Sequence, residues 1–269
     1  MEPGAIITSK RNERIRAAKR LQQRKIRDQR GMFCLEGVRV VEEALGTPFV
    51  ETIFFAERLT ETARGKALLA LAKHQGVPSF HCSDDVLAEL TDTVQSQGVV
   101  AVVNKPSWPR AMDGVTLIAD EVQDPGNMGT LLRTAVGAGC RGLYVVEGSV
   151  DLYNPKVLRS SMGAIFYLPH WLVTRKEILE LVQESNTALV IADLVDSENF
   201  WAVSYPRNLA VVIGNEARGV HPDFRKHAAL RVKIPLVGPV ESLNAPVAAG
   251  VLLYEILRQH RCNHPGSVL

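Results

Sequence analysis

The chain has 269 residues, 46% of them hydrophobic, which supplies enough apolar material for one large domain or two ordinary ones. Its net charge of +2 excludes a protein that is strongly basic or acidic as a whole. The longest uncharged stretch near the C-terminus, residues 242–254, contains Pro246 and is shorter than the roughly 18 apolar residues of a membrane span. We therefore expect a globular protein without a membrane segment.

The first 31 residues carry an excess of positive charge. Ten basic and three acidic residues give this segment a net charge of +7, which leaves −5 for the remainder. The spacing of Ile15, Leu21 and Ile26 predicts one amphipathic helix from Ser9 to about Arg30, with Ser9 as its N-cap. A basic arm of this kind is typical of proteins that bind RNA phosphates, although a solvated charged helix is the alternative. The candidate RNA-binding residues in this arm are Lys10, Arg11, Arg14, Lys19, Arg20 and Arg24.

The N-terminal segment lacks the apolar core of a secretory signal, and its acidic residues argue against an organelle transit peptide. The four cysteines are widely scattered, and none has metal-ligand spacing to another cysteine or to a histidine. We therefore predict a cytoplasmic protein with reduced cysteines and no bound metal.

Residues 1–105 combine the basic arm with a small α/β domain. After a strand at 32–37 and the helix VRVVEEAL, strands and helices alternate along the chain. The further strands are predicted at 50–56, 77–83 and 98–104, and the further helices at about 60–75 and 83–91.

Residues 106–114 contain two prolines and a glycine with little periodicity, which predicts a linker. A second α/β domain is predicted at 115–269, because its strands are nearly continuous apolar runs that alternate with helices. This pattern favours a parallel sheet covered by helices on both faces. The predicted strands are 115–122, 142–148, 164–171, 188–195, 209–215 and 230–236, and the helices about 129–139, 155–161, 175–185 and 244–260.

Ligands of open α/β sheets bind beyond the carboxyl ends of the strands, where three unusual segments occur here. The first is DPGNMGTLLRTA at 124–135. Arg133 lies about one helical turn beyond its glycine and carries a fixed fork suited to a phosphate or a carboxylate. Asn127 is a candidate site residue, and an ordinary helix N-cap is its alternative.

The second segment is IGNEARGV at 213–220. Gly214 lets the backbone approach a ligand closely, and Glu216 follows on the loop. The alternative for Glu216 is an acidic residue that stabilises a helix N-terminus.

The third segment is IPLVGPVESLNAPVAAG at 234–250, in which Ser242 and Asn244 offer polar groups and Leu243 an apolar wall. An N-cap is again the alternative for Asn244. A G-x-G-x-x-G stretch at 137–142 follows a helix and precedes a strand, which is the reverse of the dinucleotide-binding order. This order argues against a nucleotide-binding oxidoreductase.

These segments resemble the motifs of the SpoU/TrmH family of the SPOUT class, S-adenosylmethionine-dependent RNA ribose 2′-O-methyltransferases. NMGTLLRTAVGAG is similar to the family's N-x-G-x-x-x-R motif, IGNEARGV to its G-x-E-x-x-G motif, and the segment at 234–250 to its third motif. NPKVLRSSMGAIFYLP at 154–169 is similar to the family's intermediate segment. The part that contains FCLEGVRVVEEAL resembles the small substrate-binding domain that precedes many such catalytic domains.

The resemblance implies a parallel α/β domain whose C-terminal segment forms a trefoil knot, and a homodimer with active sites near the subunit interface. It also implies the cofactor S-adenosylmethionine. The residues implied in cofactor binding are Gly214, Asn215, Ile234, Ser242 and Leu243, with Ala192 and Leu194 nearby.

In the same resemblance Arg133 faces the RNA ribose, helped by Asn127, Glu216 and Asn244, and Arg159 is a further candidate RNA contact. Methyl transfer from a sulfonium is an in-line displacement that demands orientation and activation of a weakly acidic hydroxyl. Because a guanidinium stays charged in proteins, we expect it to bind a phosphate and to stabilise developing negative charge.

The sequence therefore predicts an RNA 2′-O-methyltransferase. The basic arm and the extra domain suit a structured RNA, and we favour 23S-type rRNA over the alternative, tRNA. A non-catalytic RNA-binding assembly factor of the same fold is the alternative from a different class.

Overall fold

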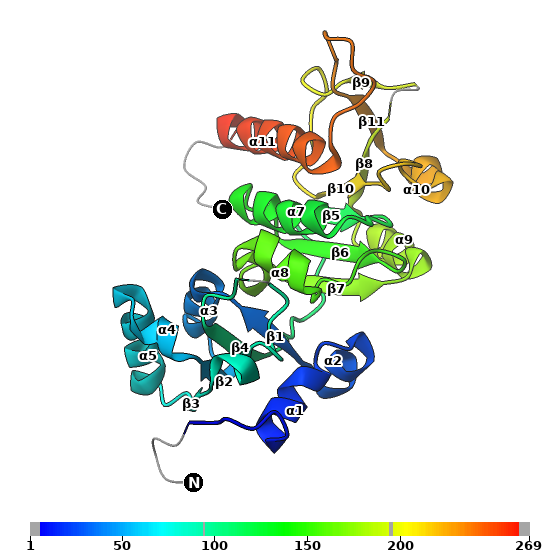
Figure 1. The fold of residues 1–269 in the computed structure, drawn as a ribbon. Helices are drawn as coiled ribbons and strands as arrows, with labels where there is room; N and C mark the ends of the chain where they lie inside the picture. Colours follow the sequence, from blue (N-terminus) through cyan, green and yellow to red (C-terminus); the bar gives the residue numbers. More distant parts are fainter. Residues whose placement is uncertain (1–5, 94, 194–195, 264–269) are drawn as a thin grey trace. The chain divides into compact units, whose positions relative to one another are not determined.

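A computed structural model describes residues 6–93, 95–193 and 196–263. The chain forms two compact units (Figure 1). The first contains Met1–Ser107 and Tyr153–Phe166, and the second contains Trp108–Leu152 and Tyr167–Leu269. The chain thus leaves the second unit after Leu152 and returns to it at Tyr167.

The first unit is an α/β structure around a four-stranded mixed sheet. Its strand order is β1-β4-β2-β3, with β4 antiparallel to both neighbours and β3 parallel to β2. The strands are β1 (Met32–Glu36), β2 (Val50–Phe55), β3 (Ser79–His81) and β4 (Val99–Asn104). The helices after the arm are α3 (Val38–Leu45), α4 (Glu57–Thr60), α5 (Ala63–His74), α6 (Asp84–Leu87), α8 (Pro155–Ser161) and the 3₁₀ helix η1 (Ala164–Phe166).

The arm forms two helices, α1 (Glu13–Arg20) and α2 (Arg24–Arg30), so the prediction of one continuous helix is wrong. The N-cap of α1 is Asn12 rather than Ser9, and its side chain accepts a hydrogen bond from the backbone N–H of Arg14. Between the helices, the buried side chain of Arg27 donates to the carbonyls of Leu21 and Gln22 at 2.9 and 2.8 Å. These bonds satisfy carbonyls that a continuous helix would have paired along its own backbone.

Residues 153–166 pack within the first unit, whereas the sequence placed them in a domain at 115–269. The ring of Phe166 lies 6.3 Å from that of Phe33 and 6.4 Å from that of Phe49. The strand predicted at 164–171 is wrong over most of its length, because η1 occupies its start and strand pairing begins only at His170. Left-handed backbone at Met162 and Gly163 turns the chain here.

The second unit contains a seven-stranded sheet in which every pairing is parallel, which confirms the predicted fold class. The strand order is β7-β6-β5-β10-β8-β11-β9. The strands are β5 (Val115–Ala119), β6 (Gly142–Val146), β7 (His170–Val173), β8 (Ala188–Ala192), β9 (Glu198–Asn199), β10 (Leu209–Ile213) and β11 (Leu230–Lys233). The helices are α7 (Pro125–Gly137), α9 (Arg175–Glu184), α10 (Pro222–His227) and α11 (Ala245–Asn263).

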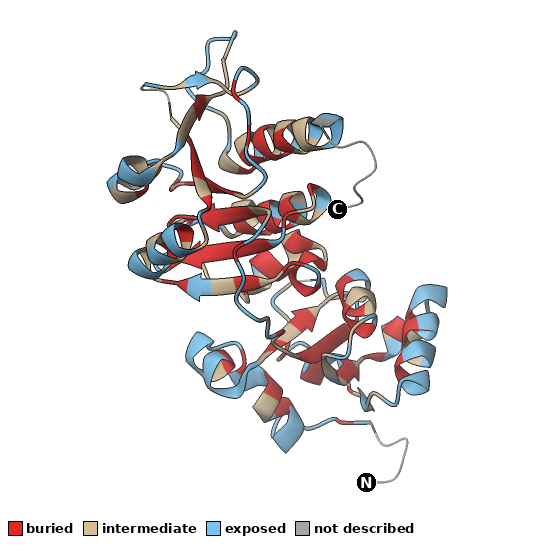
Figure 2. Cartoon of the chain, turned by 180° about the vertical axis from the view of Figure 1, so that it is seen from behind, coloured by how far each residue is buried: buried red, intermediate tan, exposed pale blue. Residues whose placement is uncertain are grey.

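Helices cover both faces of this sheet, and the central strands are buried (Figure 2). Ile118 and Val212 belong to a core cluster with Ile178 of α9 and Phe224 of α10. Alternate residues of the same strands point to the opposite face, where α7 and α11 pack against each other and against β5 and β10. No helix in the described parts of the chain has the length and apolar character of a membrane span. The trefoil knot stays a prediction.

Candidate active site

A cavity of about 600 Å³ lies at the carboxyl ends of β8, β10 and β11. In a parallel sheet these strand ends meet at one edge, so loops that are distant in sequence converge there. The cavity is lined by residues of the second and third predicted segments and of the loop after β8. Among the predicted site residues, those that line it are Ala192, Gly214, Asn215, Glu216, Ile234, Ser242, Leu243 and Asn244. Leu194 lies outside the described residues.

The loop after β10 folds back on itself at Gly214. A Cβ atom at this position would lie 2.3 Å from the backbone carbon of Gly219, so no residue with a side chain fits without moving the main chain. Asn215 and Gly219 exchange backbone hydrogen bonds of 3.1 and 2.8 Å, and Gly219 has a left-handed φ of 68°. Two glycines therefore allow the tight loop that forms one wall of the cavity.

The side chain of Asn215 shapes this loop from within. Its Oδ1 accepts hydrogen bonds from the backbone N–H groups of Ala217 and Arg218 at 3.0 and 3.1 Å. Its Nδ2 donates to the carbonyl of Glu121 at 2.9 Å. All three bonds go to the protein's own backbone, so the Asn215 amide holds the wall of the cavity in shape.

Asn127 does not cap helix α7. Asp124 is the N-cap, because its carboxylate accepts from the backbone N–H of Asn127 at 2.8 Å. The Asn127 side chain instead donates through Nδ2 to Glu216 Oε1 at 3.0 Å and accepts at Oδ1 from Asn244 Nδ2 at 3.1 Å. A carboxylate can only accept, which determines the orientation of both amides. One hydrogen-bonded chain thus joins the three predicted segments.

Glu216 also accepts from the backbone N–H groups of Gln123 and Asp124, each at 3.2 Å. Burial raises the pKa of Glu216, but the hydrogen bonds from Asn127 and from these backbone groups outweigh it, so the net shift of the pKa is downward. The carboxylate is therefore ionised at neutral pH. The alternative interpretation of Glu216, an acidic residue at the N-terminus of a helix, is wrong, because the next helix, α10, begins only at Pro222.

Arg133 lies on the exposed surface of α7 and does not line the cavity. Successive residues of an α-helix are rotated by about 100°, so Arg133, six positions after Asn127, projects from a different side of the helix. Within one chain the structure therefore brings together Asn127, Glu216 and Asn244 but not Arg133.

The predicted RNA-binding residues of the arm differ in their surroundings. Lys10 and Lys19 both bind the carboxylate of Glu89, Lys10 at 2.6 Å. The Arg14 guanidinium lies 4.7 Å above the Phe80 ring. Arg24 lies 3.8 Å from the carboxylate of Asp28.

Arg11 and Arg20 are exposed, and neither forms an ion pair with another described residue. Arg159, on α8, lies 3.4 Å from the carboxylate of Asp92 within the first unit. The arm therefore has both neutralised cations and cations that face solvent.

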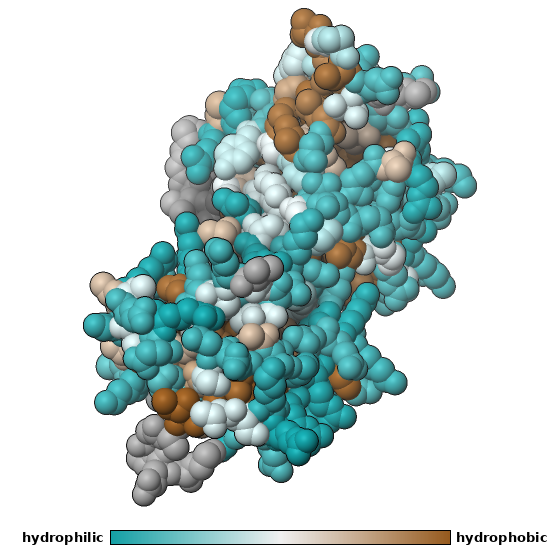
Figure 3. Space-filling view, in the orientation of Figure 1, coloured by the Kyte–Doolittle hydropathy of each residue, from teal (hydrophilic) through white to brown (hydrophobic). Residues whose placement is uncertain are grey.

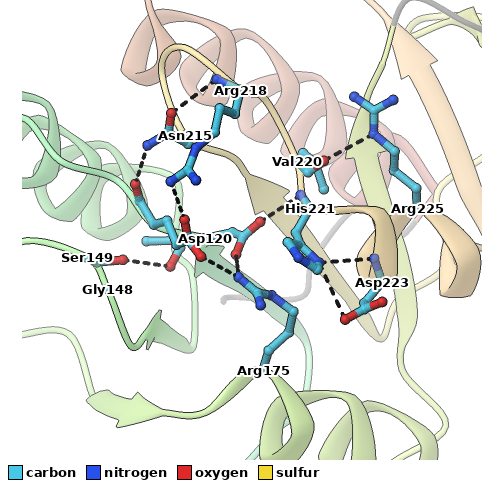
Figure 4. Close-up of polar contacts among 12 residues, drawn as sticks. Asp120, Gly148, Ser149, Arg175, Asn215, Arg218, Val220, His221, Asp223 and Arg225 are labelled. Atoms are coloured by element: carbon cyan, nitrogen blue, oxygen red, sulfur yellow. Dashed lines mark hydrogen bonds and ion pairs between the residues drawn. The ribbon is translucent and has the colours of Figure 1, made fainter.

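The sequence did not single out the other charged residues at this edge of the sheet. The Asp193 carboxylate lines the cavity, with only 7% of its side chain exposed, and lies 3.4 Å from Arg225. The Asp120 carboxylate accepts hydrogen bonds from the Arg175 guanidinium at 3.3 Å and from the backbone N–H of His221 at 2.9 Å (Figure 4). Both aspartates directly follow a strand, at β8 and β5, and this position is the signal that points to them.

The described residues contain no group of three or more histidine, cysteine, aspartate or glutamate side chains placed to hold a metal ion.

The SpoU rRNA Methylase family matches residues 114–254, and the MRM3-like substrate binding domain matches residues 12–101. The first match spans more than half of the chain and contains all three site segments. The chain belongs to the SpoU rRNA methylase family.

Within this family, the chain is 32% identical to the 23S rRNA (guanosine(2553)-2′-O)-methyltransferase RlmP of Bacillus subtilis, over 93% of this chain and 98% of that protein. It is 30% identical to the 23S rRNA (uridine(2479)-2′-O)-methyltransferase of Streptomyces viridochromogenes, over 93% and 95% of the two chains. The crystal structure of the SpoU methyltransferase AviRb from the same organism in complex with AdoMet superposes with a TM-score of 0.81 at 29% identity, over 93% and 98% of the chains. The family predicted from the motifs is thus confirmed.

Proposed function

We propose that this protein transfers a methyl group from S-adenosylmethionine to a ribose 2′-hydroxyl in 23S-type rRNA. The observation that carries the proposal is the chain of hydrogen bonds from Asn244 through Asn127 to Glu216 at the edge of the cavity. The family membership and the names of the two full-length bacterial relatives support the reaction and the class of RNA.

The cavity fits S-adenosylmethionine in size and chemistry. Its volume of about 600 Å³ lies within the range of small-molecule sites. Gly214 leaves the backbone of the loop open to close approach, and the acidic side chains of Asp193, Glu216 and Glu241 suit a ligand with a positive sulfonium. Bound there, the cofactor supplies an activated methyl group.

The chain's own residues orient the acceptor. Glu216 fixes the Asn127 amide, and Asn127 in turn holds the side chain of Asn244. The ionised carboxylate and the two amides form a preorganised polar surface on which a ribose hydroxyl can be aligned. The pKa of Glu216 lies below its usual range, which makes its carboxylate a weak base. We therefore propose that Glu216 aligns the acceptor and does not act as a strong general base.

We propose that Arg133 completes the site from a second copy of the chain in a homodimer. The exposed apolar residues Val247 and Tyr254 lie two turns apart on α11, which packs against α7. Val237 and Val240 expose further apolar surface, and apolar atoms gather over the loops near β9 and β11 (Figure 3). Burial of such surface favours association.

The division of labour in the chain follows the two matched domains. We propose that residues 1–105 bind the RNA, with the arm contacting phosphates, and that residues 115–269 perform the transfer. Arg159 contributes to the RNA surface of the first unit, where α8 packs. We propose the cytoplasm as the site of action. The mitochondrion is the alternative compartment, because the human relative rRNA methyltransferase 3 is mitochondrial.

The reaction is tested with the purified protein, radiolabelled S-adenosylmethionine and either rRNA or tRNA from cells that lack the protein. We expect label in one ribose of the large-subunit rRNA, mapped by resistance of the modified position to alkaline cleavage. Label in tRNA alone would establish the alternative substrate. Absence of cofactor binding in calorimetry, together with absence of transfer to either RNA, would indicate a non-catalytic assembly factor.

The shared site is tested by mixing two variants. Arg133→Ala and Glu216→Gln are each expected to lose transfer, and a mixture that exchanges subunits is expected to regain it, since one site of the mixed dimer then has both wild-type groups. Arg141→Ala, which changes an exposed arginine in the loop after α7, is the control. A mixture that stays inactive, or a monomer in analytical ultracentrifugation, would contradict a site built by two copies.

A further inference from the structure

Glu121 stands outside the cavity and its predicted residues, yet its contacts converge on the loop that contains Glu216. It is the second residue after β5 and has a left-handed backbone with φ of 57°. Glycine and asparagine adopt this conformation at lower cost than glutamate does. A glutamate at such a position indicates that its side chain makes interactions that offset the backbone cost.

The Glu121 carboxylate bridges two guanidinium groups. Its Oε1 accepts from Arg175 Nη2 at 2.6 Å, and its Oε2 accepts from Arg218 Nη2 at 2.6 Å. The hydrogen bond from Arg175 is the main cause that lowers the pKa of Glu121, burial acts against it, and the charge of Arg218 adds to the lowering. Arg175 comes from α9 and Arg218 from the loop after β10 (Figure 4), so the Glu121 carboxylate links these two elements.

The backbone of Glu121 holds the same loop at a second point. Its carbonyl accepts from the Asn215 side chain at 2.9 Å and from Gln123 Nε2 at 3.2 Å. Gln123 Nε2 also donates to the carbonyl of Gly148. A Cβ at Gly148 would lie 3.3 Å from Glu121 Cγ, so the side chain is closely packed there.

Residue 121 therefore binds the loop near its start, through Asn215, and near its end, through Arg218. Glu216 lies between these two anchors in the chain, and its carboxylate accepts from the Asn127 side chain. Because Glu216, Gly214 and Gly219 belong to this loop and line the cavity, a displacement of either anchor would displace the Glu216 carboxylate and the cavity wall.

We propose that Glu121 is a positioning residue of the methyl-transfer site, which acts through Arg218 and Asn215 to hold the loop at residues 214–219 in its active conformation. This role deepens the proposed function and rests on it. Glu121 is not among the residues that line the cavity. Arg218, with 71% of its side chain exposed, carries the link from the carboxylate to the loop.

The test compares Glu121→Gly, Glu121→Gln and Arg218→Gln with the control Glu147→Gln, which changes an exposed glutamate at the end of β6. Hydrogen exchange of the 215–219 peptide, cofactor binding by calorimetry, and kcat and KM for rRNA are measured for each. Glu121→Gly removes the carboxylate and also relieves the backbone conformation, so its Tm is expected to stay close to that of the wild type.

We expect faster exchange at the 215–219 peptide, weaker cofactor binding and a kcat lower by about tenfold to 100-fold in the Glu121 variants, with KM for rRNA unchanged. Arg218→Gln is expected to show the same changes to a smaller degree. Because the two groups act through one bond, the double variant Glu121→Gln with Arg218→Gln is expected to be no worse than Glu121→Gln alone.

Wild-type exchange and cofactor affinity in both Glu121→Gln and Arg218→Gln would overturn the proposal, as would fully additive effects in the double variant. If Glu121→Gly fails to fold, these two variants decide, since one preserves the size of the side chain and the other changes an exposed residue. The exchange measurement needs no RNA. Absence of transfer by the wild-type protein would thus count against the proposed function and not against this role.

Discussion

Asn127 Nδ2 lies 3.0 Å from Glu216 Oε1, although the two residues are 89 positions apart in the chain. The contact is possible because Asp124, not Asn127, caps α7 and so leaves the Asn127 amide available for the carboxylate. The consequences of this contact, and of the loop that presents Glu216, can be measured.

Asn127→Ala is expected to lower kcat by roughly 10- to 100-fold, because a hydrogen bond to a charged group contributes about 1.5–3 kcal/mol. The variant also removes the acceptor that holds Asn244. Methyl transfer to rRNA at saturating cofactor measures the effect. The control is Thr130→Ala, about one turn further along α7, which removes a hydroxyl that donates to the Gly126 carbonyl of the same helix. Equal kcat values for the two variants would show that Asn127 has no role in the reaction.

Gly214→Ala is expected to disrupt the loop, since its Cβ would lie 2.3 Å from the backbone of Gly219. Relief of such an overlap costs about 1–3 kcal/mol, which lowers Tm and weakens cofactor binding. Thermal unfolding and calorimetry report the two effects.

Gly250→Ala is the matched control for this substitution, because its Cβ meets Thr134 at an ordinary 3.6 Å inside helix α11. Alanine in a helix interior is favoured over glycine by about 0.5–1 kcal/mol, so this variant is expected to unfold at a higher temperature. A Gly214→Ala protein as stable as Gly250→Ala would contradict the geometry of the loop.

The stability that Glu216 contributes is expected to depend on pH. The pKa of Glu216 in the folded protein lies below its ordinary value of 4.5, so the folded state favours the ionised form. The contribution is therefore fully present above the unfolded pKa and is lost as pH falls through the lower folded pKa.

Urea unfolding of the wild type and of Glu216→Gln at pH values from 7 to 3 measures this dependence, because glutamine does not titrate. The difference in the free energy of unfolding is expected to be constant near neutrality and to shrink below about pH 4.5. A difference that grows as the pH falls would have the wrong sign for a carboxylate stabilised in its ionised form.

Exposed cations of the arm are expected to dominate its affinity for RNA. Arg11 and Arg20 face solvent, whereas Lys10 and Lys19 share the carboxylate of Glu89. The double variant Arg11→Ala with Arg20→Ala is therefore expected to weaken rRNA binding and to reduce the slope of log K against log salt by about 0.7–0.9 per lost phosphate contact.

The double variant Lys10→Ala with Lys19→Ala is the comparison and is expected to change the slope less. Filter binding at several salt concentrations measures both. Indistinguishable slopes in the wild type and in the arginine variant would support the alternative, in which the arm is a solvated charged surface without a role in RNA binding.

Residues 153–166 are expected to stabilise the first unit, although they follow part of the second unit in sequence. Phe166 is buried against Phe33 and Phe49, so Phe166→Ala is expected to cost about 3–5 kcal/mol and to increase hydrogen exchange in β1. Tyr167→Ala, at a neighbouring residue that is 55% exposed, is the control. Loss of protection only in the strands of the second unit would contradict this assignment.

The sequence by itself was sufficient for the family, for the parallel sheet and for eight of the residues that line the cavity. Continuous apolar runs such as those of β5 and β10 encode buried parallel strands, and a parallel sheet places their carboxyl ends at one edge. Gly214 and Glu216 were predictable because a strand end followed by glycine and a charge is a local pattern. Patterns of this kind depend only on neighbouring residues.

Only the tertiary structure decided which of the candidates meet. The sequence alone could not tell whether Asn127 caps α7 or binds Glu216, because Glu216 lies 89 positions away in the chain. The same holds for Glu121, whose role comes from Arg175 and Arg218, 54 and 97 positions away. Helical rotation separates Arg133 from the cavity, and long-range aromatic packing places Phe166 in the first unit. Such contacts depend on which distant segments of the chain pack together, and the hydrophobic periodicity of a segment carries no information about its distant partners.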